Sequence, residues 1–181
     1  MRNTSQSLAI ALTCALSASP AAHIADTSGA GGPTVMRRIT AAQYRNIMTD
    51  VFGDDIVLGG RFEPDLRVDH LVAIGAGQAS VTASGLEQYD RIARSIGAQV
   101  ADVQHRAQEV QCTPASATAP DAGCTRMFVT RVGRLLYRRP LSAAEVEGYV
   151  NAAAAATKKT GDYYGGVALA LAGILESPQF L

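Results

Sequence analysis

Residues 135–145 read "LLYRRPLSAAE", and this stretch decides where two helices meet. The residue before a proline avoids helical backbone angles, so Pro140 ends any helix that reaches it. Just beyond it, Ser142 followed by Glu145 gives the Ser-x-x-Glu pattern of a capping box, which starts a new helix. The stretch therefore predicts a sharp corner between two consecutive helices.

The helix before the corner is expected over 122–137, with Asp121 as its cap. The helix after the corner is expected to begin at Ser142 and to end at the glycine of "TKKTGD" (157–162). Helical spacing predicts which side chains of the two helices face the core. These are Phe128, Val132, Leu135, Leu136, Val146, Tyr149, Val150 and Ala153.

A further helix is expected over 163–176, where the sequence is apolar nearly all round. A helix of that kind is usually buried. Tyr163 and Tyr164 at its start are expected to dock into the core with their hydroxyl groups at its edge. Ser177 and Pro178 stop the helix.

Two more helices are expected upstream. The stretch "RRITAAQYRNIMTDVFG" (37–53) has a capping box at Thr40 and Gln43 and a glycine placed to end the helix. A second helix is predicted over 84–109, with Ser84 and Glu87 as its capping box. Its buried stripe is expected to hold Leu86, Tyr89, Ile92, Ala93, Ile96 and Val100.

Gly97 lies inside that second helix, where glycine costs about 1 kcal/mol relative to alanine. We interpret it as the mark of a close helix crossing. The segment 54–83 between the first two helices carries glycines and short apolar runs, and is expected to be mostly loop with a helical turn near 69–74. The predicted fold class is all-α, with about five amphipathic helices in an irregular bundle.

The N-terminus has the pattern of a secretory signal peptide over residues 1–21, with Arg2 followed by an apolar run and small residues before a cut after Ala21. That run is too short for a membrane span, which needs about 20 residues. A lipoprotein anchor at Cys14 is the alternative, although the residues before it fit a lipobox poorly. Residues 22–36 are small and rich in glycine, as in a flexible leader.

Removal of a signal peptide would leave Cys112 and Cys124. In an exported chain this pair predicts a single disulfide around a loop at 112–124, worth about 2–3 kcal/mol in the chain-entropy model. Two unpaired thiols are the alternative. No metal site is predicted, because the three histidines show no close pairing with the cysteines.

The formal net charge is 0, which speaks against nucleic-acid binding. Arginines nevertheless gather near the corner, and no acidic residue lies between 122 and 141. One interpretation is that they pair with Glu145 and Glu147 or lie on a solvated face. The other is an anion or partner contact, such as a carboxylate or haem propionate on a partner domain. The candidate residues for that contact are Arg131, Arg134, Arg138 and Arg139.

No catalytic constellation is evident. Gly75-Ala76-Gly77 lacks the third glycine of a dinucleotide fingerprint, and Cys-x-x-Cys-His is absent. Asp54 and Asp55 are expected in a surface loop. His70 and His105 are expected in structural or surface roles. No catalytic, cofactor-binding or metal residue is predicted in this chain.

Three stretches together resemble a known family: 37–53, "RVGRLLYRRPLSAAEVEGYV" (131–150) and "GVALALAGILESPQFL" (166–181). The chain is similar to large secreted bacterial proteins with planctomycete-cytochrome-associated domains of unknown function. Asp50-Val51-Phe52-Gly53 resembles the end of the first helix in that family's N-terminal module. Residues 138–141 resemble the Arg-Arg-Pro-Leu motif that is typical of a second module of the family.

The resemblance implies export, and a c-type haem motif further along in longer forms. It implies a helical module over 37–111 and another over 122–181. Because the family pattern continues beyond Leu181, the chain is expected to be a truncated N-terminal portion. Its apolar end, Phe180-Leu181, is then expected to lack a partner.

We predict an exported, periplasmic or secreted, non-catalytic helical scaffold or interaction module, the N-terminal fragment of a cytochrome-associated protein. Its expected partners are downstream domains or a chain of the same system, with no nucleic acid and no membrane span after signal removal. The alternative is part of an exported c-type-haem-dependent oxidoreductase whose haem region lies beyond this chain. An extracellular binding module ranks third, since the aromatic content of 6% disfavours carbohydrate stacking.

Overall fold

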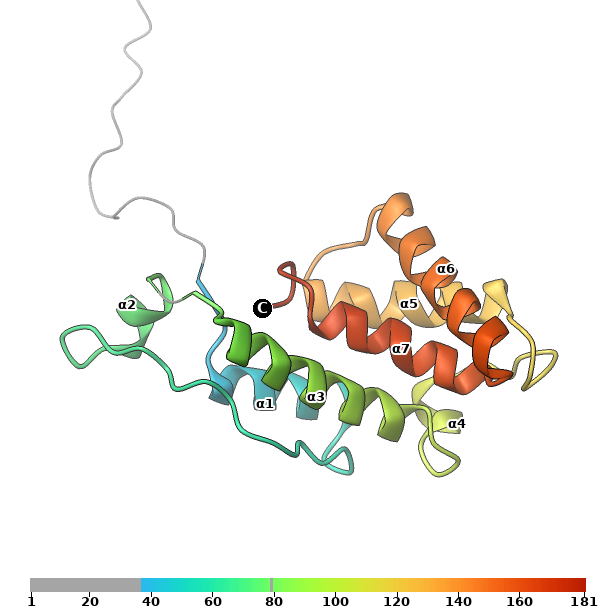
Figure 1. The fold of residues 1–181 in the computed structure, drawn as a ribbon, viewed down its shortest axis with the longest axis horizontal. Coiled ribbons are helices and arrows are strands. Elements are labelled where there is room, and N and C mark those ends of the chain that lie inside the picture. The colour runs from blue at the N-terminus through green and yellow to red at the C-terminus, as the bar shows by residue number, and fades with distance from the viewer. Residues whose placement is uncertain (1–36, 79) are drawn as a thin grey trace, which may run out of the picture. The chain divides into compact units, whose positions relative to one another are not determined.

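The computed structural model describes residues 37–78 and 80–181, and this part of the chain is helical (Figure 1). One isolated β-bridge joins Val68 to Leu71, and no strand occurs among the described residues. The predicted signal peptide, leader and Cys14 lie outside the described residues. The all-α prediction is confirmed. The elements are α1 (Ala41–Phe52), α2 (Val72–Ala76), α3 (Ala83–Val100), α4 (Arg106–Glu109), α5 (Ala122–Tyr137), α6 (Ala143–Thr160) and α7 (Tyr163–Leu175).

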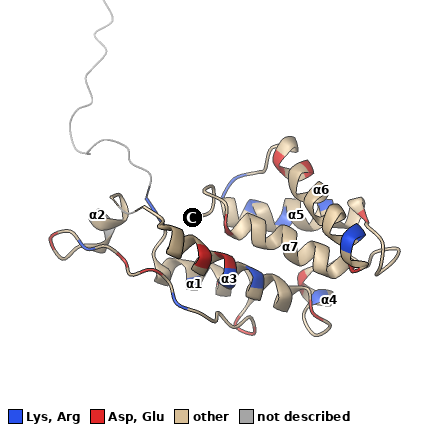
Figure 2. Ribbon diagram, viewed as in Figure 1, with Lys and Arg blue, Asp and Glu red and all other residues tan. Residues whose placement is uncertain are grey.

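The helix α7 forms the centre of the core. It packs against α3 and α6 and also touches α5 (Figure 1). Its sequence carries no charge, as Figure 2 shows, and its side chains are buried along most of its length, as the sequence predicted. Burial of these apolar side chains from several sides stabilises the whole arrangement.

Two of the predicted capping boxes are present. In α1, the Gln43 backbone N–H donates to Thr40 Oγ1 over 3.2 Å, and the Thr40 N–H donates to Gln43 Oε1 over 2.9 Å. In α6, the reciprocal pair joins Ser142 and Glu145 at 3.2 and 2.7 Å. Each such cap satisfies backbone donors that the first turn would leave unpaired.

The third predicted capping box, Ser84 with Glu87, is wrong. Thr82 caps α3 instead, accepting the Gly85 N–H over 3.0 Å. The same Thr82 hydroxyl donates to Glu63, which comes from the loop before α2. This contact with a residue distant in sequence explains why α3 is capped at Thr82, ahead of the predicted cap at Ser84.

The predicted second helix is also shorter than expected. It ends at Val100, because the Asp102 side chain accepts the N–H groups of Gln104 and His105, each over 2.8 Å. Those bonds form a turn that separates α3 from the short α4. Leu86 was placed in the buried stripe by its spacing, but it is 50% exposed.

Arg38 ties the long loop after α1 to the bundle. Its guanidinium donates to Glu63 over 2.8 Å and to the Pro64 carbonyl over 3.2 Å. The two charged side chains of the Arg38–Glu63 pair are largely buried, so each compensates the other's loss of solvent. Phe62 in the same loop packs on Tyr44 and Tyr89, with ring centroids 5.1 and 6.0 Å apart.

The end of the chain is covered, so the expectation that Phe180 lacks a partner is wrong. Phe180 is buried and packs edge-on against Tyr44 at 5.2 Å between ring centroids. The Ile39 N–H donates to the Leu181 carbonyl over 2.8 Å. The turn at Ser177 and Pro178 brings this segment back onto α1.

Gly97 marks a close crossing, as predicted. A Cβ atom at Gly97 would lie 2.5 Å from the Ala168 carbonyl oxygen of α7. Real Cβ atoms essentially never come that close to another heavy atom, so α3 can approach α7 here only because position 97 is glycine.

We predict that Gly97→Ala destabilises the protein by about 1–3 kcal/mol, because the two backbones must separate. The matched control is Gly148→Ala in α6, where a Cβ atom meets nothing within 4 Å. The control should be stabilised by up to about 1 kcal/mol through helix propensity. Urea unfolding of the full chain measures both. A Gly97→Ala protein as stable as the wild type would contradict the close crossing.

Candidate interaction site

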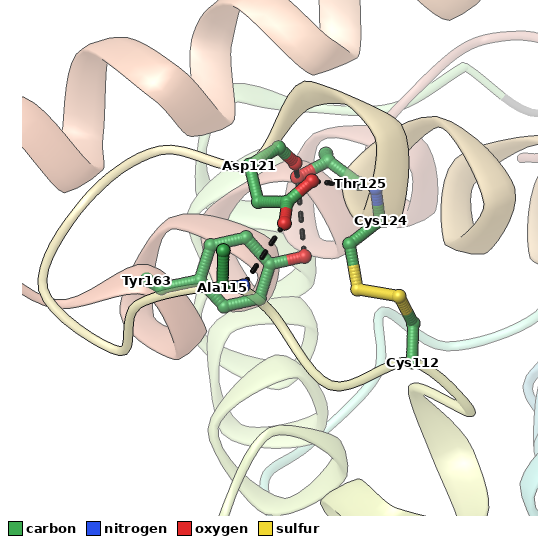
Figure 3. The surroundings of a disulfide bond; sticks show 6 residues. All are labelled: Cys112, Ala115, Asp121, Cys124, Thr125 and Tyr163. Carbon is green, nitrogen blue, oxygen red and sulfur yellow. Dashed lines mark hydrogen bonds between the residues drawn. A yellow bond between two sulfur atoms is a disulfide. The ribbon is translucent and has the colours of Figure 1, made fainter.

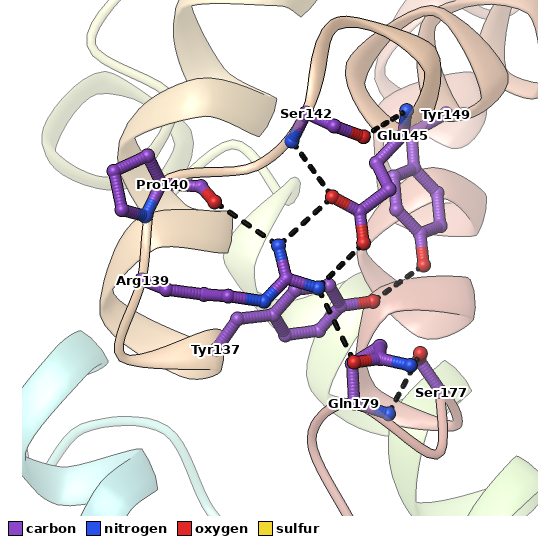
Figure 4. A network of polar contacts seen from close by, with 8 residues as sticks. All are labelled: Tyr137, Arg139, Pro140, Ser142, Glu145, Tyr149, Ser177 and Gln179. Atoms are coloured by element: carbon purple, nitrogen blue, oxygen red, sulfur yellow. Dashed lines mark hydrogen bonds and ion pairs between the residues drawn. The ribbon is translucent and has the colours of Figure 1, made fainter. Parts of the chain in front are cut away.

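The corner between α5 and α6 is held by Arg139 (Figure 4). Its guanidinium donates to both oxygens of the Glu145 carboxylate, over 2.9 and 2.6 Å. It also donates to the Pro140 carbonyl over 3.0 Å and to Gln179 Oε1 over 3.2 Å. Arg139 therefore links the corner, the first turn of α6 and the segment after α7. It is part of the internal structure and leaves few donors for a ligand.

Glu145 receives hydrogen bonds from two sides. The Arg139 guanidinium, together with the Ser142 backbone N–H, lowers the pKa of the Glu145 carboxyl from its ordinary 4.5 to about 2. A second polar tie lies beside it, where the hydroxyl groups of Tyr137 and Tyr149 meet at 2.6 Å and join α5 to α6 (Figure 4).

We predict that Glu145 contributes stability at neutral pH that is lost as the pH falls. Its folded-state pKa is below the unfolded value, so the contribution is present above about 4.5 and disappears on approach to about 2. Glu145→Gln should keep the cap, as Gln43 does in α1, and should lose less stability than the wild type between pH 5 and pH 2. Thermal unfolding across this range measures the slope.

Arg139→Gln provides the second arm, because it keeps the carboxylate and removes the largest cause of the lowered pKa. Its pH slope should lie between those of the wild type and Glu145→Gln. Three identical slopes would contradict this account of the corner.

Two other arginines of α5 have partners inside the protein. Arg126 donates through Nε to Glu147 of α6 over 3.1 Å and forms a salt bridge with the same carboxylate. Arg131 donates to the Glu109 backbone carbonyl and holds α4 against α5. The first of the two sequence interpretations was that the arginines pair with Glu145 and Glu147 across the corner. It is correct for Arg126 and Arg139.

Arg134 and Arg138 are exposed, and neither forms a salt bridge with any residue in 37–78 or 80–181. Arg138 caps α5 with a left-handed backbone, φ 55° and ψ 22°. It lies in a hollow beside Arg37 and Leu86, near the end of α7. The four candidate arginines therefore do not converge on one site. Arg131 and Arg134 share the outer side of α5, and Arg138 faces another hollow. Arg139 is exposed, and its donors are bonded to groups of the protein itself.

The outer side of α5 carries a shallow groove of about 680 Å³, which we call the α5 groove. Two apolar side chains of the groove are exposed to solvent: Met127 is 59% exposed and Leu135 is 50% exposed. The groove is lined by Gly123, Arg126, Met127, Thr130, Arg131, Arg134 and Leu135. Arginine and methionine around exposed apolar side chains are the composition found at protein–protein interfaces.

Leu135 was expected in the core, and this prediction is wrong. Leu141, in the corner just before α6, lies over Gly133, where a Cβ atom would be 2.6 Å from Leu141 Cδ1. The side of α5 that packs into the core therefore carries Val129, Gly133 and Leu136. Leu135 lies at the edge of that side and is exposed. Helical spacing placed Leu135 in the core and left Met127 off the apolar side, so only Leu135 was predicted wrongly.

The predicted disulfide between Cys112 and Cys124 is present, with 5.6 Å between the Cα atoms (Figure 3). Asp121 sits inside the closed loop and accepts the N–H groups of Cys124 and Ala115, over 2.9 and 3.1 Å. Thr125 of α5 donates to the buried Tyr163 hydroxyl over 3.3 Å. The bridge and these bonds fix the start of α5 against the start of α7.

The remaining candidate residues lie apart from the α5 groove. Asp54 and Asp55 are exposed in the turn after α1, and His70 is exposed beside α2. His105 Nδ1 lies 2.8 Å from Asp102 Oδ1. In the described part of the chain, no three His, Cys, Asp or Glu side chains come together as a metal ion would require.

Among the helices described, none combines the length and the apolar character that a bilayer crossing needs.

Two domain families match the chain. Residues 37–102 match PSD3, a protein of unknown function (DUF1587), and residues 124–181 match PSD5, a protein of unknown function (DUF1595). Both are planctomycete-cytochrome-associated domains. The chain therefore contains one domain of each of these two families. No curated protein and no solved structure matches it.

The structure shows how the two family domains meet. The PSD3 stretch contains α1 to α3, and the PSD5 stretch contains α5 from its third residue onward, α6 and α7. The crossing of α3 and α7 at Gly97 joins them, and both stretches belong to one compact unit. The disulfide-bridged loop lies between the two matches.

Proposed function

We propose that this chain is an exported, non-catalytic helical scaffold whose α5 groove holds an acidic, partly apolar surface of a cytochrome-associated partner domain. The observation that carries the proposal is the composition of the groove: exposed Met127 and Leu135 lie among arginines, in a helix with no acidic residue. Charge complementarity selects an acidic partner, and the apolar side chains supply buried area.

Export is supported by the disulfide and by the signal-like N-terminus. Disulfides persist in oxidising compartments and are rare in the cytosol. The Cys112–Cys124 bridge is therefore a structural feature that fits a periplasmic or secreted protein.

The cytochrome association favours a second candidate, in which the chain is one part of an exported c-type-haem-dependent oxidoreductase. This chain has no Cys-x-x-Cys-His, so its own residues do not fit covalent haem attachment. The haem would belong to the partner. Arg134 is exposed in the groove, and its donors suit a carboxylate or a haem propionate.

A photo-crosslinking amino acid at Leu135, in cells that make the whole system, tests the proposal. We expect mass spectrometry to identify a captured protein that carries a c-type haem motif. Arg134→Glu should reduce this capture at least tenfold, because it replaces attraction by repulsion. The same amino acid at Asn151, exposed on α6, is the control and should not capture that protein.

Equal capture from positions 135 and 151, or an unchanged yield with Arg134→Glu, would contradict the docking role. Turnover of a small substrate by the purified full chain would contradict the non-catalytic assignment. A captured partner with a haem absorption band and electron transfer that needs this chain would favour the second candidate.

A further inference from the structure

A second cleft lies on the other family domain, between the loop after α1 and one side of α3. Its volume is about 460 Å³, within the range of pockets that bind small molecules. The loop contributes Gly59, Gly60 and Arg61, and the helix contributes Gln88, Arg91 and Ser95. The three helical residues share one side of α3, as their spacing requires.

The charged residues that line this cleft are both arginines. Arg61 and Arg91 come from different elements, and neither forms a salt bridge or a side-chain hydrogen bond within the described residues. This contrasts with Arg94 on the same helix, which donates to Asp90 over 2.7 Å. Two guanidinium groups without an acidic partner, facing one cleft, suit an oxyanion.

Gln88, one of the cleft residues, carries a polar atom without a partner among the described residues. Its side-chain oxygen is buried and accepts no hydrogen bond. Because an unsatisfied buried acceptor is unfavourable, a rotation of the Gln88 side chain that brings this oxygen to a ligand donor in the cleft would relieve it. A hydroxyl group provides such a donor, and the Ser95 hydroxyl lines the same cleft.

The loop that carries Arg61 is anchored on both sides. Before it, the Val57 N–H donates to Gln99 Oε1 and the Gln99 amide donates back to the Val57 carbonyl, each over 2.9 Å. Gly60 packs on Ile92, since a Cβ atom there would lie 3.1 Å from Ile92 Cγ1. After it, Phe62 is packed in the aromatic cluster. The position of the Arg61 backbone is thus fixed before any ligand arrives, which lowers the entropy that binding must overcome.

We infer that this cleft binds a small hydroxylated oxyanion, such as an acidic sugar bearing a carboxylate or a phosphate. Arg61 and Arg91 contact the anionic group, and Gln88 accepts a hydrogen bond from a hydroxyl. No aromatic residue lines the cleft, so charge and hydrogen bonding select the ligand instead of stacking. The site is separate from the α5 groove and does not depend on the proposed scaffold role.

The test is a titration of the full chain, followed by the backbone and side-chain amide signals in ¹H–¹⁵N spectra. The probes are glucuronate, glucose 6-phosphate, glucose and acetate. We expect saturable shifts at Gly59, Gly60 and the Gln88 amide with glucuronate or glucose 6-phosphate, and much weaker ones with glucose and acetate. The stronger of the two anionic sugars identifies the anionic group.

Arg61→Gln and Arg91→Gln should each weaken binding about tenfold, in keeping with the loss of a charge-assisted hydrogen bond. Arg94→Gln is the matched control, from the same helix but with its guanidinium on Asp90, and should bind as the wild type does. Gln88→Met should reduce the preference for glucuronate over acetate.

Three results would overturn the inference. They are shifts that do not saturate with either anionic sugar, equal weakening by Arg94→Gln, and acetate binding as tightly as glucuronate. Unchanged far-UV circular dichroism and melting temperature in the arginine variants separate lost binding from lost folding.

Discussion

The crossing of α3 over α7 at Gly97 is the contact on which the rest of the structure depends. The Ala168 carbonyl leaves no room for a side chain at position 97, so the two helices meet backbone to backbone. One helix belongs to the PSD3 stretch and the other to the PSD5 stretch. The two family domains therefore share one apolar core, and α7 supplies several of its fully buried side chains.

Polar ties around this core fix the positions of the surfaces. Arg139 joins the α5–α6 corner to the segment after α7, Arg38 fixes the loop after α1, and the disulfide holds the start of α5. Each tie uses a guanidinium or a covalent bond between residues distant in sequence. Arg134 on the α5 groove, and Arg61 and Arg91 in the cleft between the loop after α1 and α3, form no salt bridge among the described residues. We propose that these three arginines supply the charge of the two contact sites.

Much of the fold could be predicted from local sequence. Pro140, the capping boxes at Thr40 and Ser142, and the apolar run of α7 act through neighbours a few residues away, so they are visible in the chain itself. The rest depends on tertiary contacts. Thr82 replaces Ser84 as the cap of α3 because its hydroxyl group donates a hydrogen bond to Glu63. Leu135 is exposed because the packing of the corner before α6 on Gly133 places another side of α5 in the core. The arginine partners could not be assigned either, since sequence shows a charge but not what lies opposite.

Native-state hydrogen exchange of the full chain, at increasing urea concentration, tests the shared core most directly. If α3 and α7 form a single core, the amides of Ile96 to Gln99 and of Val167 to Leu171 open together, with the same free energy and the same urea dependence. Exchange of the α3 amides through a separate opening of lower free energy, while α7 stays protected, would show two independent domains and contradict the account.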